Sequence, residues 1–498
     1  MVAFILPANS ATGGYEIDNS MRFNRGDAAC LRKTFSGSPT STKKCTISFW
    51  TKLADPSNTD AKAIFSAIKS GSNEDVIKFM GVNNGILNGI EINFNNTGDG
   101  SMMISSGSST LIKFRDPSAW YHIVIAIDSS QGTASNRVKV YVNGTQFDTE
   151  ARVEGGSVAD DVALSQNYEL GFLTASAHSI GENVESAGNE PYDGYLAEFH
   201  FVDGQQLAPT TFAETDDNGA WIPKDCKGDL TYGNYGFFLE FKQTGTSANA
   251  SGKGADTSGN DNHFDDANAT AEDITVDTPT NNFATLNPLI PVQQVPVYSE
   301  GNTKVVFKDG GNGCSPLSTF AVNSGKFYFE AKFVQTSDPG HGAIGVGIVD
   351  ADKYNPFGDA DDAFDLESFG YSYTTDGNAK TSGNDSSFGD EFNSGDIIGV
   401  AVDFDNRQIY YSKNGTFQDS GDPTSGASGT GSAHNFSVGT YYFAVYAYQE
   451  ENSWEMNFGN APFSISSGNA DANGYGNFEY AVPSGYYSLC TKNLAEYG

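Results

Sequence analysis

The densest run of residues that could do chemistry lies between positions 338 and 396, where thirteen acidic residues stand against two lysines. Inside this run, Tyr354 and Phe357 precede Asp359, Asp361 and Asp362. Aromatic rings exposed beside carboxylates can stack on sugars or dock a protein. We therefore predict these five residues as a ligand-binding loop, with burial of both rings as the alternative.

The same carboxylates raise the question of a bound cation, because calcium prefers oxygen ligands from acidic loops. The sequence holds no Asp-x-Asp-x-Asp-Gly string with a closing Glu, which a calcium-binding loop of the EF-hand type requires. A solvated acidic loop is the favoured interpretation. We predict no cofactor and no metal site, and calcium stays an alternative that no motif indicates.

Other catalytic patterns are missing from the sequence. The six histidines occur singly, and His122 and His200 fall within strand-like runs that favour a framework role. Neither a Gly-x-Ser-x-Gly elbow nor a phosphate-binding loop is present. Five cysteines without a CxxC pair indicate no zinc site, although Cys30 and Cys45 could be bridged if their strands pair.

The composition bounds the class of protein and its partners. A formal charge of −34 over 498 residues would repel nucleic acid and anionic membranes, so neither is predicted as a partner. The first residues lack the basic region of a secretory signal, and no apolar run approaches the roughly 20 residues that span a bilayer. We expect synthesis in a cytoplasm and no membrane insertion.

Short strands joined by turns are expected along most of the chain. Gly numbers 56, aromatic residues reach 13%, and charged residues make up only 18%, a profile that favours strands over helices. Two similar hairpin signals, at Asn143-Gly144 and at Asn414-Gly415, each follow a pair of strand-like runs. The sequence therefore predicts an all-β protein with two β-sandwich domains in tandem.

Four motifs in the first half support a family resemblance. Residues 46–50, 120–124, 138–144 and 193–199 read TISFW, WYHIV, VKVYVNG and DGYLAEF. Together they resemble the laminin G-like, concanavalin A-like jelly roll, and we predict such a domain over residues 1–207. Several glycan hydrolases share this fold and carry a Glu-x-Asp-x-x-Glu string, but the nearest string here, Glu16-Ile17-Asp18, reaches Met21 where the second Glu belongs.

The next stretch, residues 208–300, is rich in Thr, Asn, Asp, Gly and Pro and is predicted as an irregular connector with one strand at 236–242. Its strings at 256–264 and 278–283, DTSGNDNHF and TPTNNF, resemble segments that follow jelly rolls in virion proteins of tailed bacteriophages.

Strand-like runs resume at residue 301. Residues 325–330, 345–348, 395–400 and 456–459 read GKFYFE, GVGI, GDIIGV and MNFG and resemble the SPRY domain. We predict a SPRY-like sandwich over residues 301–463, followed by an aromatic tail, residues 464–498, that packs back or serves as an anchor.

These resemblances imply two binding modules without catalytic residues. With the phage-like connector, they predict a non-enzymatic virion protein of a tailed bacteriophage, such as a tail fibre that binds host surface glycan or protein. A head-fibre or capsid-decoration protein and a polysaccharide depolymerase are the alternatives. The expected location is the virion, the expected partners are other virion proteins, and a homo-oligomer is expected.

Overall fold

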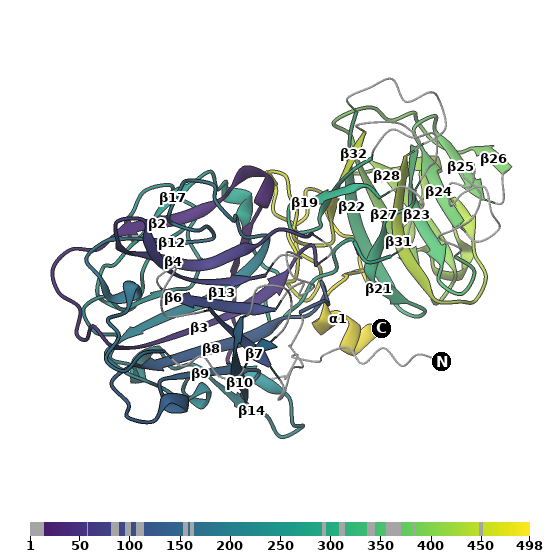
Figure 1. Ribbon diagram of the computed structural model, residues 1–498. Helices are drawn as coiled ribbons and strands as arrows, with labels where there is room; N and C mark the ends of the chain where they lie inside the picture. Colours follow the sequence, from purple (N-terminus) through teal and green to yellow (C-terminus); the bar gives the residue numbers. More distant parts are fainter. Residues whose placement is uncertain are drawn as a thin grey trace. The chain divides into compact units, whose positions relative to one another are not determined.

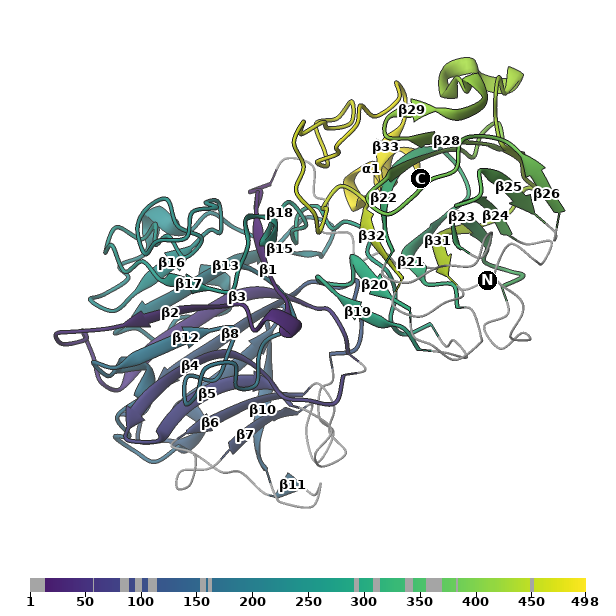
Figure 2. The ribbon, with the colours of Figure 1, turned by 90° about the horizontal axis from the view of Figure 1, so that it is seen from above.

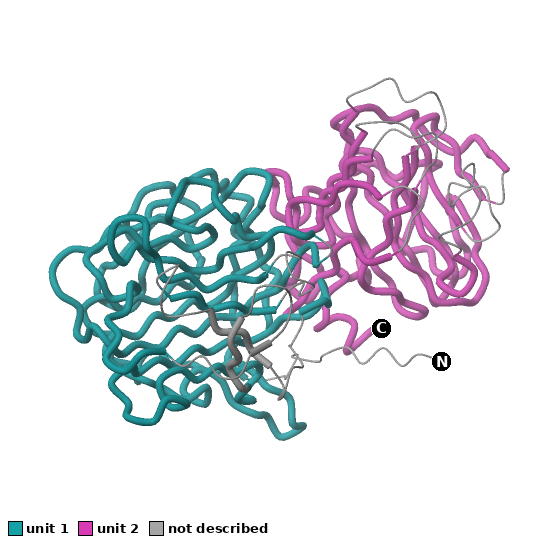
Figure 3. Tube along the Cα trace, viewed as in Figure 1, with its two compact units in different colours: residues 1–280 teal, residues 281–498 magenta. Residues whose placement is uncertain are grey.

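The chain forms two compact units, residues 1–280 and residues 281–498, in the computed structural model (Figure 3). The structure describes residues 14–56, 58–80, 89–94, 101–105, 114–152, 158–159, 164–290, 295–307, 314–335, 344–354, 370–381, 384–447 and 452–498. Nearly all regular structure is β, and both units are β-sandwiches, so the predicted all-β fold class is confirmed.

The first unit is built from short and medium strands with brief 3-10 turns between them (Figure 1). Its strands are β1 (Ser20–Phe23), β2 (Cys30–Thr34), β3 (Lys44–Leu53), β4 (Lys62–Ser70), β5 (Asn73–Phe79), β6 (Ile90–Phe94), β7 (Ser101–Ser105), β8 (Tyr121–Asp128), β9 (Val138–Val142), β10 (Thr145–Arg152), β11 (Val158–Ala159), β12 (Ala177–Ile180), β13 (Gly194–Asp203), β14 (Ala213–Thr215), β15 (Trp221–Pro223), β16 (Phe237–Leu239), β17 (Asp265–Ala267) and β18 (Ile274–Thr275).

Strand β10 makes the sandwich by belonging to both of its layers. Its first residues pair with β9, and its later residues pair with β7. One layer runs β17-β2-β12-β4-β5-β6-β7, and the other runs β9-β8-β3-β13-β1-β18, with β16 also paired to β13. Figure 2 shows β4, β5 and β6 side by side in the first layer.

Aromatic side chains fill the space between the two layers. The Phe65 ring lies 5.1 Å from Phe172 and 5.6 Å from Phe199, and Phe199 stacks on Phe49 at 5.3 Å. Such ring pairs add specific geometry to the burial of apolar area. This core holds the layers in register and leaves the outer face of the β3-β8-β13 layer to be covered by other parts of the chain.

Residues 205–240 cover that face. The prediction of an irregular connector over residues 208–300 did not include this role. Phe212, Cys226 and Tyr232 pack with Val124 and Val202 of the outer face. Farther along, β16, β17 and β18 extend the sheets themselves. The segment differs from a linker because its Thr- and Asn-rich composition is interrupted by apolar side chains that have a sheet face to bury against.

The Asn143-Gly144 turn between β9 and β10 is locked from two sides. Asn143 has a φ of 46°, and its backbone N–H and side-chain Oδ1 bond to the backbone of His122, at 2.9 and 2.8 Å. Gly144 has a φ of +78°, and a Cβ there would lie 2.7 Å from the Trp221 ring. The turn therefore needs Gly both for its conformation and for its contact with Trp221.

The second unit repeats the sandwich with a different strand order. Its strands are β19 (Val297–Ser299), β20 (Lys304–Val306), β21 (Leu317–Val322), β22 (Lys326–Val334), β23 (Ile344–Asp350), β24 (Gly370–Thr374), β25 (Asn378–Thr381), β26 (Asn384–Ser387), β27 (Ile397–Asp403), β28 (Gln408–Lys413), β29 (Thr416–Phe417), β30 (His434–Asn435), β31 (Tyr441–Ala447), β32 (Ser453–Asn457) and β33 (Tyr487–Ser488), and a helix, α1 (Thr491–Tyr497), follows.

Two sheets face each other in this unit. One runs β19-β20-β32-β22-β27-β28-β29 and the other runs β21-β31-β23-β24-β25-β26. Its Asn414-Gly415 turn repeats the first turn, because Asn414 bonds through N–H and Oδ1 to Ile397, at 2.8 and 2.9 Å. A Cβ on Gly415 would lie 2.5 Å from the Tyr480 ring.

The aromatic tail packs on the second unit through a buried carboxylate. Glu330 on β22 accepts the backbone N–H groups of Glu479 and Tyr480, at 2.9 and 2.8 Å, and the Asn457 amide at 3.0 Å. Phe478 and Tyr486 pack against Tyr328, Ala401 and Tyr410 on the same sheet. The tail therefore covers the outer face of its sheet as residues 205–240 cover theirs.

Cysteine pairing does not contribute to either unit. All five cysteines are free and buried. The Cys30–Cys45 bridge considered from the sequence is absent because β2 pairs with β12 and β17, whereas β3 pairs with β8 and β13. Among the helices in the described ranges, none combines the length and apolar character that crossing a membrane requires.

Replacing Gly144 with Ala tests the turn. We expect a loss of about 3 kcal/mol in the free energy of unfolding, since a Cβ costs about 1–2 kcal/mol in the left-handed region and overpacking against Trp221 adds about 1–2 kcal/mol. Gly37→Ala is the matched control, because Gly37 has a φ of +86° with no heavy atom within 4 Å of the added Cβ. Equal losses for the two variants, measured by denaturant unfolding, would contradict the role of Trp221.

Candidate functional site

The predicted ligand-binding loop lies at the end of β23. Tyr354 is partly buried against Leu317, Val349 and Tyr446, and its hydroxyl donates to the Ser315 carbonyl at 3.4 Å. The Tyr354 ring therefore contributes to packing, which is the alternative that the sequence left open. Phe357, Asp359, Asp361 and Asp362 lie outside the described residues.

The described residues next to Tyr354 form a rim that we define as residues 350–354 and 436–440 of the second unit. The Ala351 N–H donates to the Thr440 carbonyl at 2.8 Å and ties the two stretches together. Asp350 pairs with Lys353 at 2.9 Å. Val438 is 83% exposed at the tip, so the rim presents an apolar side chain on a hydrogen-bonded support.

A second polar site lies in the first unit, where β13 contains a β-bulge. Ala197 pairs with Trp50 and His200 pairs with Ser48, so two residues of β13 face one residue of β3. Glu198 is the extra residue, with a φ of 45°. Without the bulge, strand alternation would turn Glu198 to the same face as Leu196, into the apolar core.

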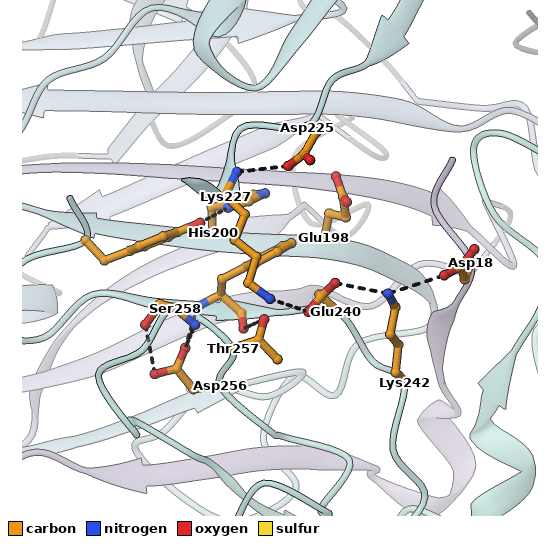
Figure 4. Close-up of polar contacts among 12 residues, drawn as sticks. Asp18, Glu198, His200, Asp225, Lys227, Glu240, Lys242, Asp256, Thr257 and Ser258 are labelled. Carbon is orange, nitrogen blue, oxygen red and sulfur yellow. Dashed lines mark hydrogen bonds and ion pairs between the residues drawn. The ribbon is translucent and has the colours of Figure 1, made fainter. Parts of the chain in front are cut away.

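Charged side chains gather near the bulge, as Figure 4 shows. Glu240 lies between two lysines, 3.0 Å from the Lys227 ammonium and 3.1 Å from that of Lys242. Lys242 also lies 3.2 Å from the Asp18 carboxylate. These ion pairs are half exposed, so each contributes little to stability, in the range of about 0–1 kcal/mol.

Glu198 differs from its neighbours because it is buried, at 5% exposure. Burial is the main cause that raises its pKa to about 8, with the charges of Glu240 and Asp225 adding to the effect. Hydrogen bonds and the nearby lysines lower the pKa of Glu240 despite its own partial burial. Environments that shift the pKa values of two neighbouring carboxyl groups in opposite directions are typical of catalytic acid and base pairs.

The surroundings of Glu198 do not suit catalysis, however. The Tyr15 hydroxyl donates to Glu198 Oε1 at 2.5 Å, and burial also raises the pKa of Tyr15 well above its usual range. The buried carboxyl group accepts a hydrogen bond from a protein hydroxyl. A buried carboxyl group of this kind can keep its proton and fix a neighbouring segment through a hydrogen bond. This is a structural role for a group whose pKa is shifted.

His200 and His122 belong to buried stacks beside this site. His200 stacks on Phe238 at 3.9 Å and shares a 2.9 Å hydrogen bond between its Nδ1 and the Tyr232 hydroxyl. His122 Nε2 lies 2.9 Å from Ser48 Oγ, and the Trp221 indole donates to His122 Nδ1 at 3.1 Å. Both ring nitrogens of His122 and the Nδ1 of His200 are hydrogen-bonded, and both rings are buried, which fits the framework role predicted for these two histidines.

Sequence reasoning did not single out Glu198, Tyr15, Glu240 or Lys242. The available signal was one acidic residue inside the long apolar run of β13, which predicts either a bulge or a buried polar partner. Within the described ranges, no three His, Cys, Asp or Glu side chains come together in a group that could hold a metal ion.

Comparison with known families assigns a domain to each unit. Residues 26–209 match the Concanavalin A-like lectin/glucanases superfamily, and residues 326–461 match the SPRY domain. The chain therefore has a laminin G-like, concanavalin A-like domain followed by a SPRY domain, as predicted. Domains of these two kinds are typically non-enzymatic binding domains.

Individual relatives are more distant. A Drosophila melanogaster protein named Ran-binding proteins 9/10 homolog is 32% identical over 124 residues, which are 24% of this chain and 12% of the relative's length. The human HERC1 SPRY domain is 18% identical, with a TM-score of 0.27, and covers 34% of this chain and 96% of its own. A SAP-like pentraxin from Limulus polyphemus is 16% identical, with a TM-score of 0.24, covering 39% of this chain and 80% of its own.

The comparison with the fly protein contradicts the prediction of a bacteriophage virion adhesion protein, because the matched relative is a eukaryotic SPRY protein. The prediction and its head-fibre and depolymerase alternatives are therefore withdrawn. The strings that resembled virion proteins have a local structural role. Asp256 accepts the Phe238 N–H at 2.9 Å, and Asn260 and Asn262 each donate to the Gly236 carbonyl at 2.9 Å.

Acid should destabilise the first unit through its buried histidines. Burial lowers the pKa of His122 and His200 to about 3 and that of His178 to about 4. Each is neutral when folded but takes up a proton when unfolded below about pH 6.5. The histidine contribution to stability is therefore full above that pH and falls by roughly 1.4 kcal/mol per pH unit and histidine below it.

His200→Gln should remove one histidine's share of this slope, measured as the free energy of unfolding at a series of pH values from 7 to 4. His434→Gln is the matched control in the second unit, where burial lowers the pKa of His434 to about 4. That change should alter only the unfolding of the second unit. An unchanged acid slope in the His200 variant would contradict the assignment.

Proposed function

We propose that this protein is a protein-interaction protein, in which the SPRY domain binds a polypeptide partner and the concanavalin A-like domain provides a second rigid module. The SPRY match over residues 326–461 is the observation that carries the proposal, because SPRY domains mediate protein–protein interaction. The buried and hydrogen-bonded polar groups described above support a binding role over a catalytic one.

The charge of the second unit favours a basic partner. Residues 281–498 contain 26 Asp and Glu against 9 Lys and Arg. Several of these carboxylates are exposed, among them Asp352, Asp390, Glu391, Asp405 and Asp419. A surface of one sign raises the rate of association with the opposite sign and makes it depend on salt.

The rim is the part of the second unit that we propose as the contact surface. Val438 offers an exposed apolar anchor, and Asp352 adds a negative charge within the same rim. The Ala351–Thr440 hydrogen bond fixes the two stretches relative to each other, so a partner would meet a surface that needs little ordering. A few anchor residues commonly supply most of the binding energy of an interface, and a rigid support lowers the entropy cost of binding.

Val438→Ser tests this proposal in the full chain, because it removes the apolar anchor without changing the charge. The wild-type chain is screened against an array of 15-residue peptides of varied charge, and dissociation constants are measured for the peptides that bind. We expect basic peptides to bind, their affinity to fall with added salt, and Val438→Ser to weaken binding about fivefold to tenfold. Val297→Ser is the matched control, because Val297 is 43% exposed on β19 and lies outside the rim.

Two results would overturn the proposal. If no peptide binds the wild-type chain, the interaction function is contradicted. If peptides bind and both valine variants bind equally well, the rim is the wrong surface.

A further inference from the structure

We infer that residues 14–19 form a proton-sensitive latch, held over the outer face of the first unit by the contact between Tyr15 and Glu198 and released as Glu198 loses its proton. This inference concerns the first unit and does not depend on the proposed binding function of the second.

The latch segment covers an aromatic surface without joining a sheet. Ile17, which is 5% exposed, packs in a cluster with Trp50, Trp120 and Tyr195. Residues 15–19 belong to no strand, and the first ladder contacts begin at Ser20 in β1. The segment is therefore held by side-chain packing and a few hydrogen bonds, which makes it easier to open than the strands beside it.

Hydrogen bonds and an ion pair fasten the segment. The Ile17 N–H donates to Thr280 Oγ1, and Thr280 Oγ1 donates back to the Ile17 carbonyl, both at 3.1 Å. Asp18 pairs with Lys242 at 3.2 Å, but this pair is exposed and contributes little. The Tyr15–Glu198 hydrogen bond is the contact that reaches a buried ionisable group.

The bulge is what places Glu198 under the segment. Because Glu198 is the extra residue of β13, its carboxyl group lies on the outer side of the sheet and not among the core phenylalanines. The closed latch covers the carboxyl group, whereas an open latch would let water reach it. Closing therefore removes the group from solvent, and this favours the protonated form.

Some of the groups around Glu198 raise its pKa and others lower it. Glu240, Asp225 and the Cys226 thiol lie on the segments that pack over the sheet, and the charges of Glu240 and Asp225 oppose ionisation of Glu198. Lys242 and the Tyr15 hydroxyl favour ionisation but do not offset burial, which is the largest effect. The Tyr232 hydroxyl, which interacts electrostatically with Glu198, and His200 complete the surroundings of the Glu198 carboxyl group.

Proton linkage then gives the pH dependence of opening. The closed state keeps its proton up to a pKa of about 8, whereas an open, solvated Glu198 loses it near the ordinary pKa of about 4.3. Between these values the closed state binds one more proton than the open state. The opening constant should therefore rise about tenfold per pH unit between roughly pH 5 and 8 and level off above pH 8.

Amide hydrogen exchange of the full chain measures this opening directly. The Ile17 amide is the reporter, because its bond to Thr280 exists only when the latch is closed. After correction for the intrinsic pH dependence of exchange, its protection factor should fall about tenfold per pH unit from pH 5 to 8 and then stay constant. The amide of Val140, in the middle of β9, is the reference for global unfolding.

Two variants separate the proton from the hydrogen bond. Glu198→Gln keeps a neutral side chain of the same size, so the Ile17 protection factor should become independent of pH. Tyr15→Phe keeps the ring but removes the hydroxyl, so opening should increase about fivefold to tenfold, while the pH dependence remains because Glu198 stays buried.

The latch is contradicted if Ile17 protection in the wild-type chain does not change with pH, or if Glu198→Gln shows the wild-type pH dependence. Should Glu198→Gln fail to fold, the Tyr15→Phe variant decides alone: unchanged protection of Ile17 would overturn the role of the Tyr15–Glu198 contact. Peptide binding by the second unit is measured separately, so failure of either proposal is visible without the other.

Discussion

Both units depend on burying the outer face of one sheet beneath chain that comes later in the sequence. In the first unit, residues 205–240 cover β3, β8 and β13, and in the second unit the tail covers β22, β27 and β28. Each sheet face carries aromatic and apolar side chains that would be costly to leave in water. The covering segments are therefore parts of the sandwiches, and the surface left for recognition is the rims and loops.

Within each cover, the same few devices fix the later chain to the sheet. An aromatic ring, Trp221 or Tyr480, lies against the Gly of an Asn-Gly turn. A buried carboxylate also accepts backbone N–H groups of the covering segment, as Asp203 does for Tyr235 and Glu330 does for residues 479 and 480. Such hydrogen bonds to a charged acceptor are strong and leave few buried polar groups unsatisfied. The likeness of the two units thus extends from the turns to what covers them.

Much of the fold could be predicted from the sequence because its strongest signals are local. The alternation of β9, the Asn-Gly turns and the apolar runs of β8 and β27 predicted strands where the structure has them. Strands such as β12 and β17 were missed, since they are short, polar and defined mainly by their partners. The bulge at Glu198 was missed for the same reason: the register of β13 against β3 depends on both strands at once. Long-range pairing, and the charges that it brings together, has no signature in a single segment.

The residues that follow each sandwich are integral to it, and amide exchange of the full chain at neutral pH can show this. The N–H groups of β16, at residues 237–239, and of β17, at residues 265–267, should exchange far more slowly than those of an unstructured peptide. Phe238 should be among the most protected, because it donates to the buried Asp256 carboxylate at 2.9 Å. Exchange of these segments at the rate of an unstructured peptide would show that they are a linker and not part of the sandwich.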